Sequence, residues 1–196
     1  MLSNGFHDVP NGKVAMVVTH LEMTTPPPLR ELALPDGITF RQVASDLPWY
    51  RDIFDRVGAP WLWYRRRAFE DAELMAILND PKVALYSLSR DGQDEALLEL
   101  DFRKEGDCEL GYFGLTPKLI GSGAGRWLMN KAIELAWAAP ITRFHLQTCT
   151  NDSAPAMDFY IRSGFTPYRR QVEVDDDPRL NGISGEDNAP HVPLIR

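Results

Sequence analysis

Apolar and polar positions alternate along several short segments of the chain, with the period of two that is typical of half-buried strands. Residues 13–23 are rich in β-branched and apolar side chains, and residues 38–43 alternate strictly. Three further segments, 83–89, 95–103 and 108–115, are joined by glycine-containing turns and predict an antiparallel meander. Two later strands are expected at 141–148 and 166–174.

A helical period of apolar positions replaces this alternation elsewhere. The pattern turns helical over residues 49–78, with a break at 58–60, and again over 127–137. A short helix is expected after Asn151. The order is strand, two helices, three strands, helix, strand, helix and strand, with the strand at 13–23 added in front. This order predicts one mixed α/β domain that comprises the 196 residues.

The composition is that of a globular protein. Of the 196 residues, 44% are hydrophobic and 25% charged, enough for a sizeable core. A net charge of −7 and a pI near 5.1 argue against non-specific nucleic-acid binding, which needs clustered Lys and Arg. The local exception is the run 65–67, three arginines that we expect on a solvated helix face or, alternatively, at an anion-recognition rim.

The sequence shows neither a targeting pattern nor a metal-binding pattern. The first residues do not combine a basic segment with an apolar stretch, and no apolar run approaches 18 residues, so we expect a cytoplasmic location without a membrane partner. Cys108 and Cys149 lack the spacing of a zinc site or a disulfide framework. His20, His145 and His191 show no pairing that indicates a metal, and we expect none.

The two ends of the chain are expected to lie outside the main pattern. Residues 1–30 predict an N-terminal extension whose strand, 13–23, would leave an added sheet edge. Residues 175–196, rich in Asp, Asn, Gly and Pro, predict an extended tail on the surface or across a neighbouring subunit. Because an open strand edge favours pairing with another chain, we expect a homodimer formed through this strand or the tail.

A glycine-rich bend joins the strand that ends at Leu115 to the helix at 127–137, and it reads Gly121-Ser122-Gly123-Ala124-Gly125-Arg126. The first amides of a helix lack internal partners and carry the positive end of its dipole, and small residues let an anion approach the backbone. The bend therefore predicts a phosphate site. Glycines that only make a tight turn would give the same pattern.

This bend and the segment after residues 141–148 fall in register with two known motifs. Residues 115–117 and 120–125 match Val/Leu-x-Pro followed by Arg/Gln-x-x-Gly-x-Gly/Ala, except that Ile120 replaces Arg or Gln. The motif Asn-x-x-Ala-x-x-x-Tyr-x-x-x-Gly-Phe is met at Asn151, Ala154 or Ala156, Tyr160, Gly164 and Phe165. Over residues 109–168 the chain thus resembles the GNAT-type N-acetyltransferase superfamily. The resemblance implies a mostly antiparallel central sheet flanked by helices, and acetyl-CoA as cosubstrate.

The resemblance also implies where acetyl-CoA would lie. The pantetheine arm would pair with the main chain near Gly114, and the pyrophosphate would rest on the amides of the bend. The residues implied in cofactor binding are Phe113, Gly114, Leu115, Gly121, Ser122, Gly123, Ala124, Gly125, Arg126, Asn151 and Tyr160. Arg126 would pair with a phosphate or simply be exposed, and Asn151 would position CoA or a water, or cap the next helix.

Tyr160 stands at the tyrosine that acts as general acid in many family members, and a phenol of pKa about 10 can protonate a thiolate. It could also be only a packing aromatic. For the base, Glu109 lies an even number of residues before Leu115, which puts both side chains on one face of a strand. A glutamate at this offset deprotonates the amine in several members. Glu99, Asp101 or a water are the alternatives.

The sequence therefore predicts an acetyl-CoA-dependent N-acetyltransferase whose acceptor, a small-molecule or peptide amine, attacks the thioester directly. The alternative is a non-catalytic acyl-CoA-binding regulatory module. A nucleotide-binding domain ranks last, because no Gly-Lys-Ser/Thr follows the glycines. The acceptor pocket or the core would take the aromatic residues of the first helical region, Trp49, Tyr50, Trp61, Trp63 and Tyr64.

Overall fold

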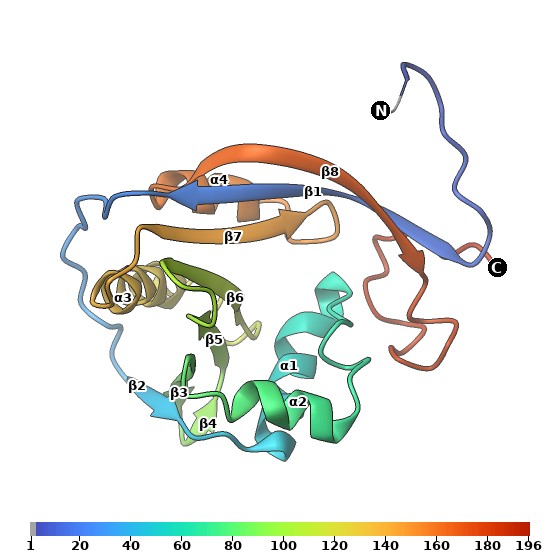
Figure 1. Ribbon diagram of the computed structural model, residues 1–196. Helices are drawn as coiled ribbons and strands as arrows, with labels where there is room; N and C mark the ends of the chain where they lie inside the picture. Colours follow the sequence, from blue (N-terminus) through green and yellow to red (C-terminus); the bar gives the residue numbers. More distant parts are fainter. Residues whose placement is uncertain (1–2) are drawn as a thin grey trace.

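Eight strands form one sheet in the computed structural model, which describes residues 3–196 (Figure 1). The strands are β1 (Lys13–Met23), β2 (Ile38–Val43), β3 (Val83–Arg90), β4 (Gln93–Asp94), β5 (Ala96–Asp101), β6 (Asp107–Leu115), β7 (Arg143–Cys149) and β8 (Thr166–Asp176). The helices are α1 (Leu47–Gly58), α2 (Asp71–Leu78), α3 (Ala124–Trp137) and α4 (Ala156–Arg162), with a short 3-10 helix, η1 (Ala59–Trp61). This mixed α/β architecture confirms the predicted fold class.

The strands follow one another across the sheet in the order β2-β3-β5-β6-β7-β1-β8, and β4 pairs with β3. β3, β5 and β6 form the predicted antiparallel meander. The turn between β3 and β4 places Asp91 and Gly92 at positive φ, a conformation that Asp tolerates and glycine favours. β6 and β7 are paired in parallel, and α3 makes the connection between them.

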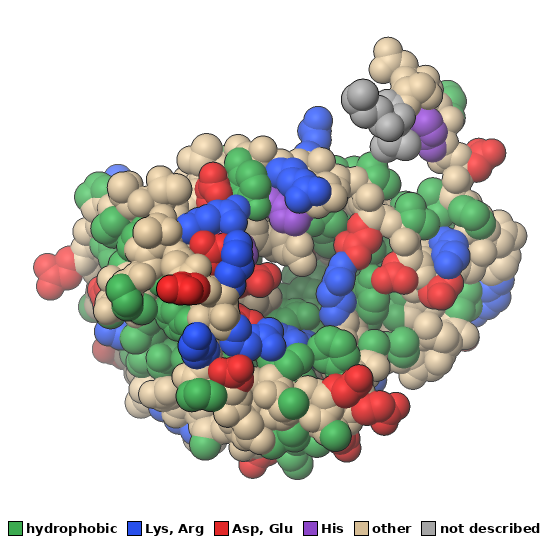
Figure 2. Space-filling view, viewed as in Figure 1, with side chains coloured by type: hydrophobic (Ala, Val, Ile, Leu, Met, Phe, Trp, Pro, Cys, Tyr) green, Lys and Arg blue, Asp and Glu red, His purple; other side chains and the backbone are tan. Residues whose placement is uncertain are grey.

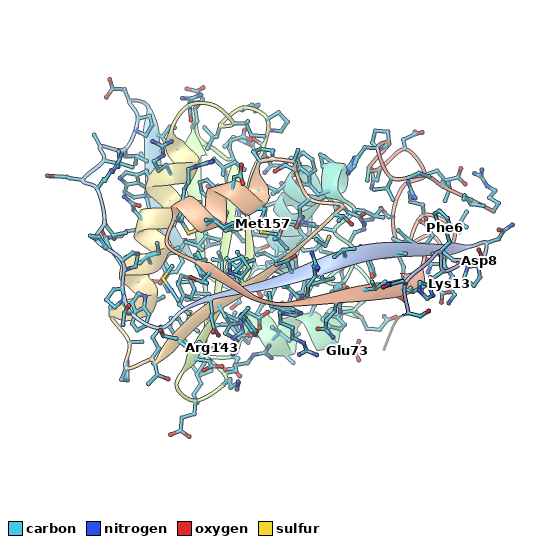
Figure 3. All side chains as sticks on the ribbon, turned by 90° about the horizontal axis from the view of Figure 1, so that it is seen from above. Phe6, Asp8, Lys13, Glu73, Arg143 and Met157 are labelled. Atoms are coloured by element: carbon cyan, nitrogen blue, oxygen red, sulfur yellow. The ribbon has the colours of Figure 1, made fainter. Side chains whose placement is uncertain are left out.

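β1 lies inside the sheet, where it pairs antiparallel with both β7 and β8. Figure 3 shows β1 and β8 side by side, with Met157 of α4 and Glu73 of α2 on opposite sides of the pair. The prediction that this strand leaves an added edge is wrong, because β8 pairs with residues 13–22 and β7 pairs with residues 18–23 on the other edge. The homodimer stays a prediction, and of the two segments expected to form it the C-terminal one is the segment that does not lie inside the sheet.

Two apolar cores cover the opposite faces of the sheet. Along β5, Leu98 and Leu100 point into the core that contains α3 and α4, whereas Leu97 points into the core of α1 and α2. We refer to these as the α3/α4 face and the α1/α2 face. The alternation follows directly from the period of two in a strand, and it makes β5 buried on both sides.

Residues 62–70, between η1 and α2, are not helical, contrary to the prediction for residues 49–78. α1 begins at Leu47, where the Asp46 carboxylate caps it by accepting a hydrogen bond from Trp49 N at 2.8 Å. After η1, Leu62 adopts a left-handed φ of 58°, and turns follow up to α2. Trp63 packs back onto α1 in this segment, since a Cβ on Gly58 would lie 2.6 Å from Trp63 Cβ.

The arginine run 65–67 lies in this non-helical segment, so the predicted solvated helix face is wrong. Each guanidinium instead has a carboxylate partner, and the pairs are Arg65–Glu173, Arg66–Glu99 and Arg67–Asp55. These partners come from β8, β5 and α1. The run therefore ties three separate elements together, and its charges are compensated within the chain.

Residues 177–196 differ from the expected extended tail, because they fold into turns that pack against β1. Ala189 and Val192 are buried there. Arg179 is a buried side chain that pairs with Asp177 at 2.7 Å and donates to the carbonyl of Val192 at 2.9 Å. The segment thus covers one end of the sheet with its own small core.

The interior position of β1 predicts a clear difference between two residues of that strand. Leu21 is fully buried, so Leu21→Ala should lower the free energy of unfolding by about 2–5 kcal/mol. Val17 is 37% exposed, and Val17→Ala should change it by less than about 0.5 kcal/mol. Urea denaturation of the two variants checks this, and equal small losses would contradict the packing of β1 in the core.

Candidate functional site

β6 and β7 separate after a short stretch of pairing and leave a gap within the sheet. Their paired positions are Asp107 with Arg143, Cys108 with Phe144 and Glu109 with His145. Beyond these positions β6 remains paired with β5 and β7 with β1, so the facing edges of residues 110–115 and 146–149 have no strand partner. A cavity of about 600 Å³ occupies this gap.

The cavity reaches both faces of the sheet. Its lining on the α3/α4 face includes Leu110, Phe113, Leu115, Phe159 and Tyr160, and on the α1/α2 face it includes Trp61, Trp63, Tyr64, Tyr112 and Cys149. Figure 2 shows the surface hollowed between β7 and α1, with acidic and basic side chains around the hollow. Two molecules that enter from opposite faces could therefore meet in the middle of the sheet.

A bulge in β6 decides which of its side chains share a face. The pairing with β5 skips Gly111. As a result Glu109 opposes Asp101 on the α1/α2 face, while Leu115 opposes Ala96 on the α3/α4 face. The prediction that Glu109 and Leu115 share a face is wrong, because the extra residue of the bulge reverses the alternation.

The glycine-rich bend stands at the α3/α4 end of the cavity, where Gly121 and Gly125 line it. Gly121 and Gly123 have φ values of 82° and 90°, which favour glycine. Within residues 3–196, the amides of all three glycines make no hydrogen bond to the rest of the chain. Together with the dipole of α3, these donors form a place for an anion.

The other residues of the bend have different surroundings. Ser122 Oγ donates to the carbonyl of Leu119 at 2.7 Å and accepts from Ala124 N at 3.3 Å, so this hydroxyl fastens the loop. Ala124 is fully buried in the core of α3. Arg126 is exposed on the first turn of α3 and does not line the cavity.

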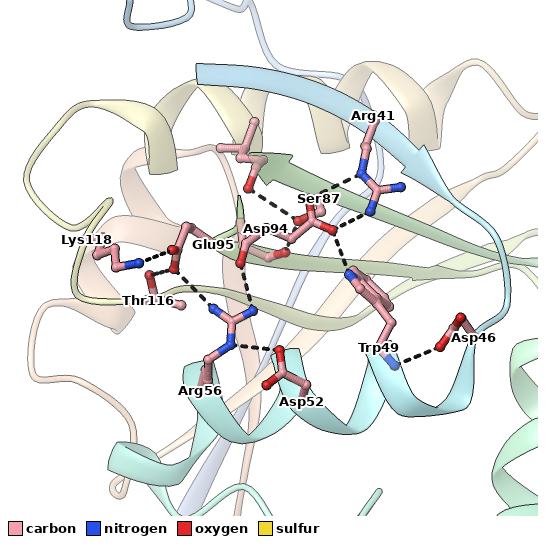
Figure 4. A network of polar contacts seen from close by, with 12 residues as sticks. Arg41, Asp46, Trp49, Asp52, Arg56, Ser87, Asp94, Glu95, Thr116 and Lys118 are labelled. Carbon is pink, nitrogen blue, oxygen red and sulfur yellow. Dashed lines mark hydrogen bonds and ion pairs between the residues drawn. The ribbon is translucent and has the colours of Figure 1, made fainter. Parts of the chain in front are cut away.

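Glu95 anchors the segment that leads into the bend (Figure 4). Its buried carboxylate accepts hydrogen bonds from Thr116 Oγ1 at 2.6 Å, Lys118 Nζ at 2.6 Å and Arg56 Nη1 at 3.1 Å. Burial alone would raise the pKa of Glu95, but the hydrogen bonds from Lys118 and Thr116 outweigh it and hold the pKa below its usual value. An ionised Glu95 therefore connects α1 to residues 116–118.

Tyr160 lies in the wall of the cavity at the level of Phe113, and their ring centroids are 6.5 Å apart in an edge-on arrangement. Burial, and to a smaller degree the nearby carboxylate of Asp152, raises the pKa of Tyr160 above its usual value. The phenol therefore stays protonated near neutral pH and can donate a proton to a group in the cavity.

Asn151 is buried in the same wall. Its carbonyl accepts a hydrogen bond from His191 Nε2 at 2.9 Å, and its side-chain amide lies 3.9 Å from Met16 Sδ. The alternative role of Asn151 as a helix cap is wrong, because α4 begins only at Ala156. The C-terminal segment thus holds the loop that carries Asn151.

Glu109 lies outside the gap cavity. It lines a second cavity of about 390 Å³ together with Asp101, Arg103, Lys104, Asp107 and His145. Burial and the neighbouring carboxylates of Asp101 and Glu99 raise the pKa of Glu109, although Arg66 acts in the opposite direction. A carboxylate with a raised pKa accepts a proton more readily near neutral pH than an ordinary one does.

The two alternative bases are held in ion pairs. Glu99 is fully buried, pairs with Arg66 and accepts a hydrogen bond from the Tyr50 hydroxyl at 2.5 Å. Asp101 pairs with Arg103 at 2.6 Å. Burial alone would raise the pKa of Asp101, but the hydrogen bonds from Arg103 lower it overall. Both carboxylates are therefore less available than that of Glu109.

Three charged residues of the gap cavity were not singled out from the sequence, namely Asp152, Arg162 and Glu173. Asp152 accepts hydrogen bonds from Trp63 Nε1 at 3.4 Å and Thr148 Oγ1 at 2.5 Å, and Arg162 lines the cavity from the end of α4. Asp152 and Arg162 lie within the motif at 151–165, and this position is the signal in the sequence that could have indicated them. Of the five aromatic residues expected at a pocket, Trp49 and Tyr50 do not line this cavity.

No helix among residues 3–196 has both the length and the apolar character needed to cross a membrane. Nor does that part of the chain bring three or more His, Cys, Asp or Glu side chains together as metal ligands.

Comparison with known proteins adds to this geometry. A family model described as "Acetyltransferase (GNAT) family" matches residues 40–165. The match includes the meander, the glycine-rich bend and α4, and it leaves out β1 and β8. No curated protein matches the chain.

Solved structures share the fold. A GCN5-related N-acetyltransferase from Sphaerobacter thermophilus has a TM-score of 0.59 and 19% identity, with 83% of this chain and 52% of that chain covered. A GCN5-related N-acetyltransferase from Kribbella flavida has a TM-score of 0.57 and 21% identity, with 87% of this chain and 63% of that chain covered. An aminoglycoside acetyltransferase from an uncultured soil metagenomic sample has a TM-score of 0.55 and 14% identity, with 67% of this chain and 90% of that chain covered. The chain thus spans between half and two thirds of the length of the two GCN5-related structures.

The surroundings of Glu109 predict a pH-dependent effect on stability. Its folded pKa is raised, so its contribution to stability is present below the unfolded pKa of about 4.3 and is lost as the pH rises through the folded pKa. Glu109→Gln should therefore raise the melting temperature relative to wild type near pH 8 but not near pH 4. The exposed neighbour Glu105 is the control, and Glu105→Gln should show no such difference. A gain that is equal at both pH values would contradict the prediction.

Proposed function

Because the chain belongs to the acetyltransferase (GNAT) family, we propose that it transfers the acetyl group of acetyl-CoA to an amine. The observation that carries this proposal is the cavity that crosses the sheet between β6 and β7. Such a cavity lets a thioester enter from one face and an amine from the other, so that the two meet beside Tyr160. Proximity of this kind is a major part of catalysis of a two-substrate reaction.

The α3/α4 end fits the anionic part of acetyl-CoA. The free amides of Gly121, Gly123 and Gly125 and the N-terminus of α3 would hold the pyrophosphate. Arg162 lines the same cavity and would add a cation. The unpaired edge of residues 113–115 would bond the amides of the pantetheine arm, much as a strand partner would.

The chemistry follows from this placement. The amine nitrogen attacks the thioester carbonyl, a C–N bond forms, the C–S bond breaks, and the departing thiolate takes the proton of Tyr160. Glu109 would receive the proton of the amine, directly or through water, since it lies on the face from which the amine arrives. A regulatory module that only binds acyl-CoA is the second candidate, favoured by the position of Glu109 outside the gap cavity.

We also propose the class of acceptor and the location of the reaction. The net charge of −7 supports a small-molecule or peptide amine rather than nucleic acid as the acceptor. We also propose a cytoplasmic location. Release of free thiol from acetyl-CoA in the presence of a panel of amines tests the enzyme against the regulatory module. Binding of acetyl-CoA without thiol release for any amine would favour the module.

Tyr160→Phe should lower the turnover number by about 10²- to 10⁴-fold, because only the proton donor is removed. The affinity for acetyl-CoA should stay within about twofold, since the ring and its packing are kept. Tyr168, an exposed tyrosine of β8, provides the control, and Tyr168→Phe should leave turnover unchanged. Unchanged turnover in Tyr160→Phe would show that Tyr160 is only a packing residue.

Gly123→Val should weaken acetyl-CoA binding by at least about tenfold, or 1.4 kcal/mol. The φ of 90° at this position strains any β-branched residue, so the amides of the bend would move out of place. Gly182 has a comparable φ of 79° in a turn of the C-terminal segment, and Gly182→Val is the control for strain alone. Titration calorimetry measures both, and equal affinities in folded variants would rule out the anion site.

A further inference from the structure

The α1/α2 end of the gap cavity is walled mainly by aromatic rings. Trp61, Trp63, Tyr64 and Tyr112 line it. The Trp63 ring packs against two others that also contact each other, with centroids 5.1 Å from Tyr112 and 5.5 Å from Phe54. Fixed aromatic faces of this kind fit an apolar or aromatic stem and can also attract a cation.

The basic side chain at this end already has a partner. Arg65 and Glu173 both line the cavity and form an ion pair with each other. The neighbouring Tyr64 hydroxyl donates to Asp175 at 2.8 Å. A ligand carboxylate that entered here would therefore have to compete with Glu173 for Arg65.

Asp152, in contrast to Arg65, accepts hydrogen bonds only from neutral groups. Its three hydrogen-bond donors are neutral: the Trp63 indole, the Thr148 hydroxyl and the Cys149 amide, the last at 2.9 Å from Oδ2. None of the ion pairs formed among residues 3–196 includes Asp152. A half-buried carboxylate without a cation favours the binding of one.

The position of Asp152 suits an acceptor that is about to react. Its partners Thr148 and Trp63 come from the α3/α4 and α1/α2 sides of the gap, so it lies between the two ends of the cavity. It is also close enough to Tyr160 to influence the ionisation of that phenol. A cation bound at Asp152 would thus sit near the proposed proton donor.

We propose that the acceptor is a cationic amine on an apolar or aromatic stem, with no carboxylate beside the amine, and that Asp152 binds its ammonium group before transfer. This inference rests on the proposed function and deepens it. An amino acid would place its carboxylate near Asp152 and Glu173, where the cation at this end, Arg65, is already paired with Glu173. Repulsion and lost solvation would then select against amino acids.

Phenethylamine and phenylalanine form a matched pair of probes, since they differ only in the carboxylate. Calorimetry with wild-type protein saturated with CoA should show phenethylamine binding at least about tenfold more tightly than phenylalanine. 2-Phenylethanol, which keeps the stem but lacks the ammonium group, should also bind at least about tenfold more weakly. Equal affinity of phenethylamine and either of the other two would overturn the proposal.

Asp152→Asn tests the residue itself and should weaken phenethylamine binding about tenfold while the affinity for CoA stays unchanged. Asp176 is an exposed carboxylate of β8 that pairs with Lys13 outside the cavity, so Asp176→Asn should change neither affinity. Undiminished binding of phenethylamine to a folded Asp152→Asn protein would overturn the role of Asp152. If Asp152→Asn shows no cooperative unfolding on heating, the variant is not folded. The binding of the three probes to wild-type protein then decides whether the acceptor is a cationic amine.

These binding experiments do not require turnover, so the two proposals can fail separately. Tight binding of phenethylamine without thiol release from acetyl-CoA with any amine would overturn the proposed function and leave the acceptor site. Thiol release with phenylalanine that equals or exceeds release with phenethylamine would overturn the acceptor class and leave the acetyltransferase.

Discussion

The separation of β6 from β7 is the constraint on which the site depends. Backbone amides and carbonyls of residues 110–115 and 146–149 face a gap instead of a neighbouring strand, although buried backbone groups are normally hydrogen-bonded. The strands can diverge because each keeps its other neighbour, and because separate helices cover each face. A ligand with amide groups is the natural partner for such an edge, which is why the gap is a binding site and not a packing defect.

Close packing on β6 keeps the gap in place. A Cβ on Gly114 would lie 2.4 Å from Val57 Cγ1, so α1 rests directly on the backbone of this strand. At the bulge, a Cβ on Gly111 would lie 2.9 Å from the carboxylate of Glu99. Both glycines are therefore required by their neighbours in the fold, whatever binds in the cavity. Larger side chains there would push α1 or Glu99 away from β6.

Two loops at the cavity are held by residues that are distant in the sequence. Glu95 fixes the segment before the glycine-rich bend, and His191 fixes the loop of Asn151. The Glu95 carboxylate is buried, so removing its hydrogen-bond donors would leave it unsatisfied and lower the stability. The loops therefore share the stability of the core. The charges also differ along the cavity, because free amides and Arg162 face the α3/α4 end, whereas Asp152 lies between the two ends.

The sequence by itself determined the fold class, the meander and the glycine-rich bend. These features depend on local properties: the period of two in a strand, the turn residues, and the positive φ values that Gly121 and Gly123 require. The motifs of the sequence also predicted that Phe113, Gly121, Asn151 and Tyr160 lie at one site, and these four residues line one cavity. The spacing of residues within each motif is a local property.

Only the tertiary structure decided the rest. β1 is interior because β8 pairs with its outer edge, and no local pattern specifies which strand a given edge will meet. Glu109 changes face because a bulge forms where Glu99 packs against Gly111, a contact between two strands. Within residues 3–196 Asp152 forms no ion pair, whereas Arg65 and Arg66 pair with Glu173 and Glu99 from other strands. Pairing, bulges and charge compensation all arise from contacts between distant residues, which hydrophobic period and turn chemistry do not encode.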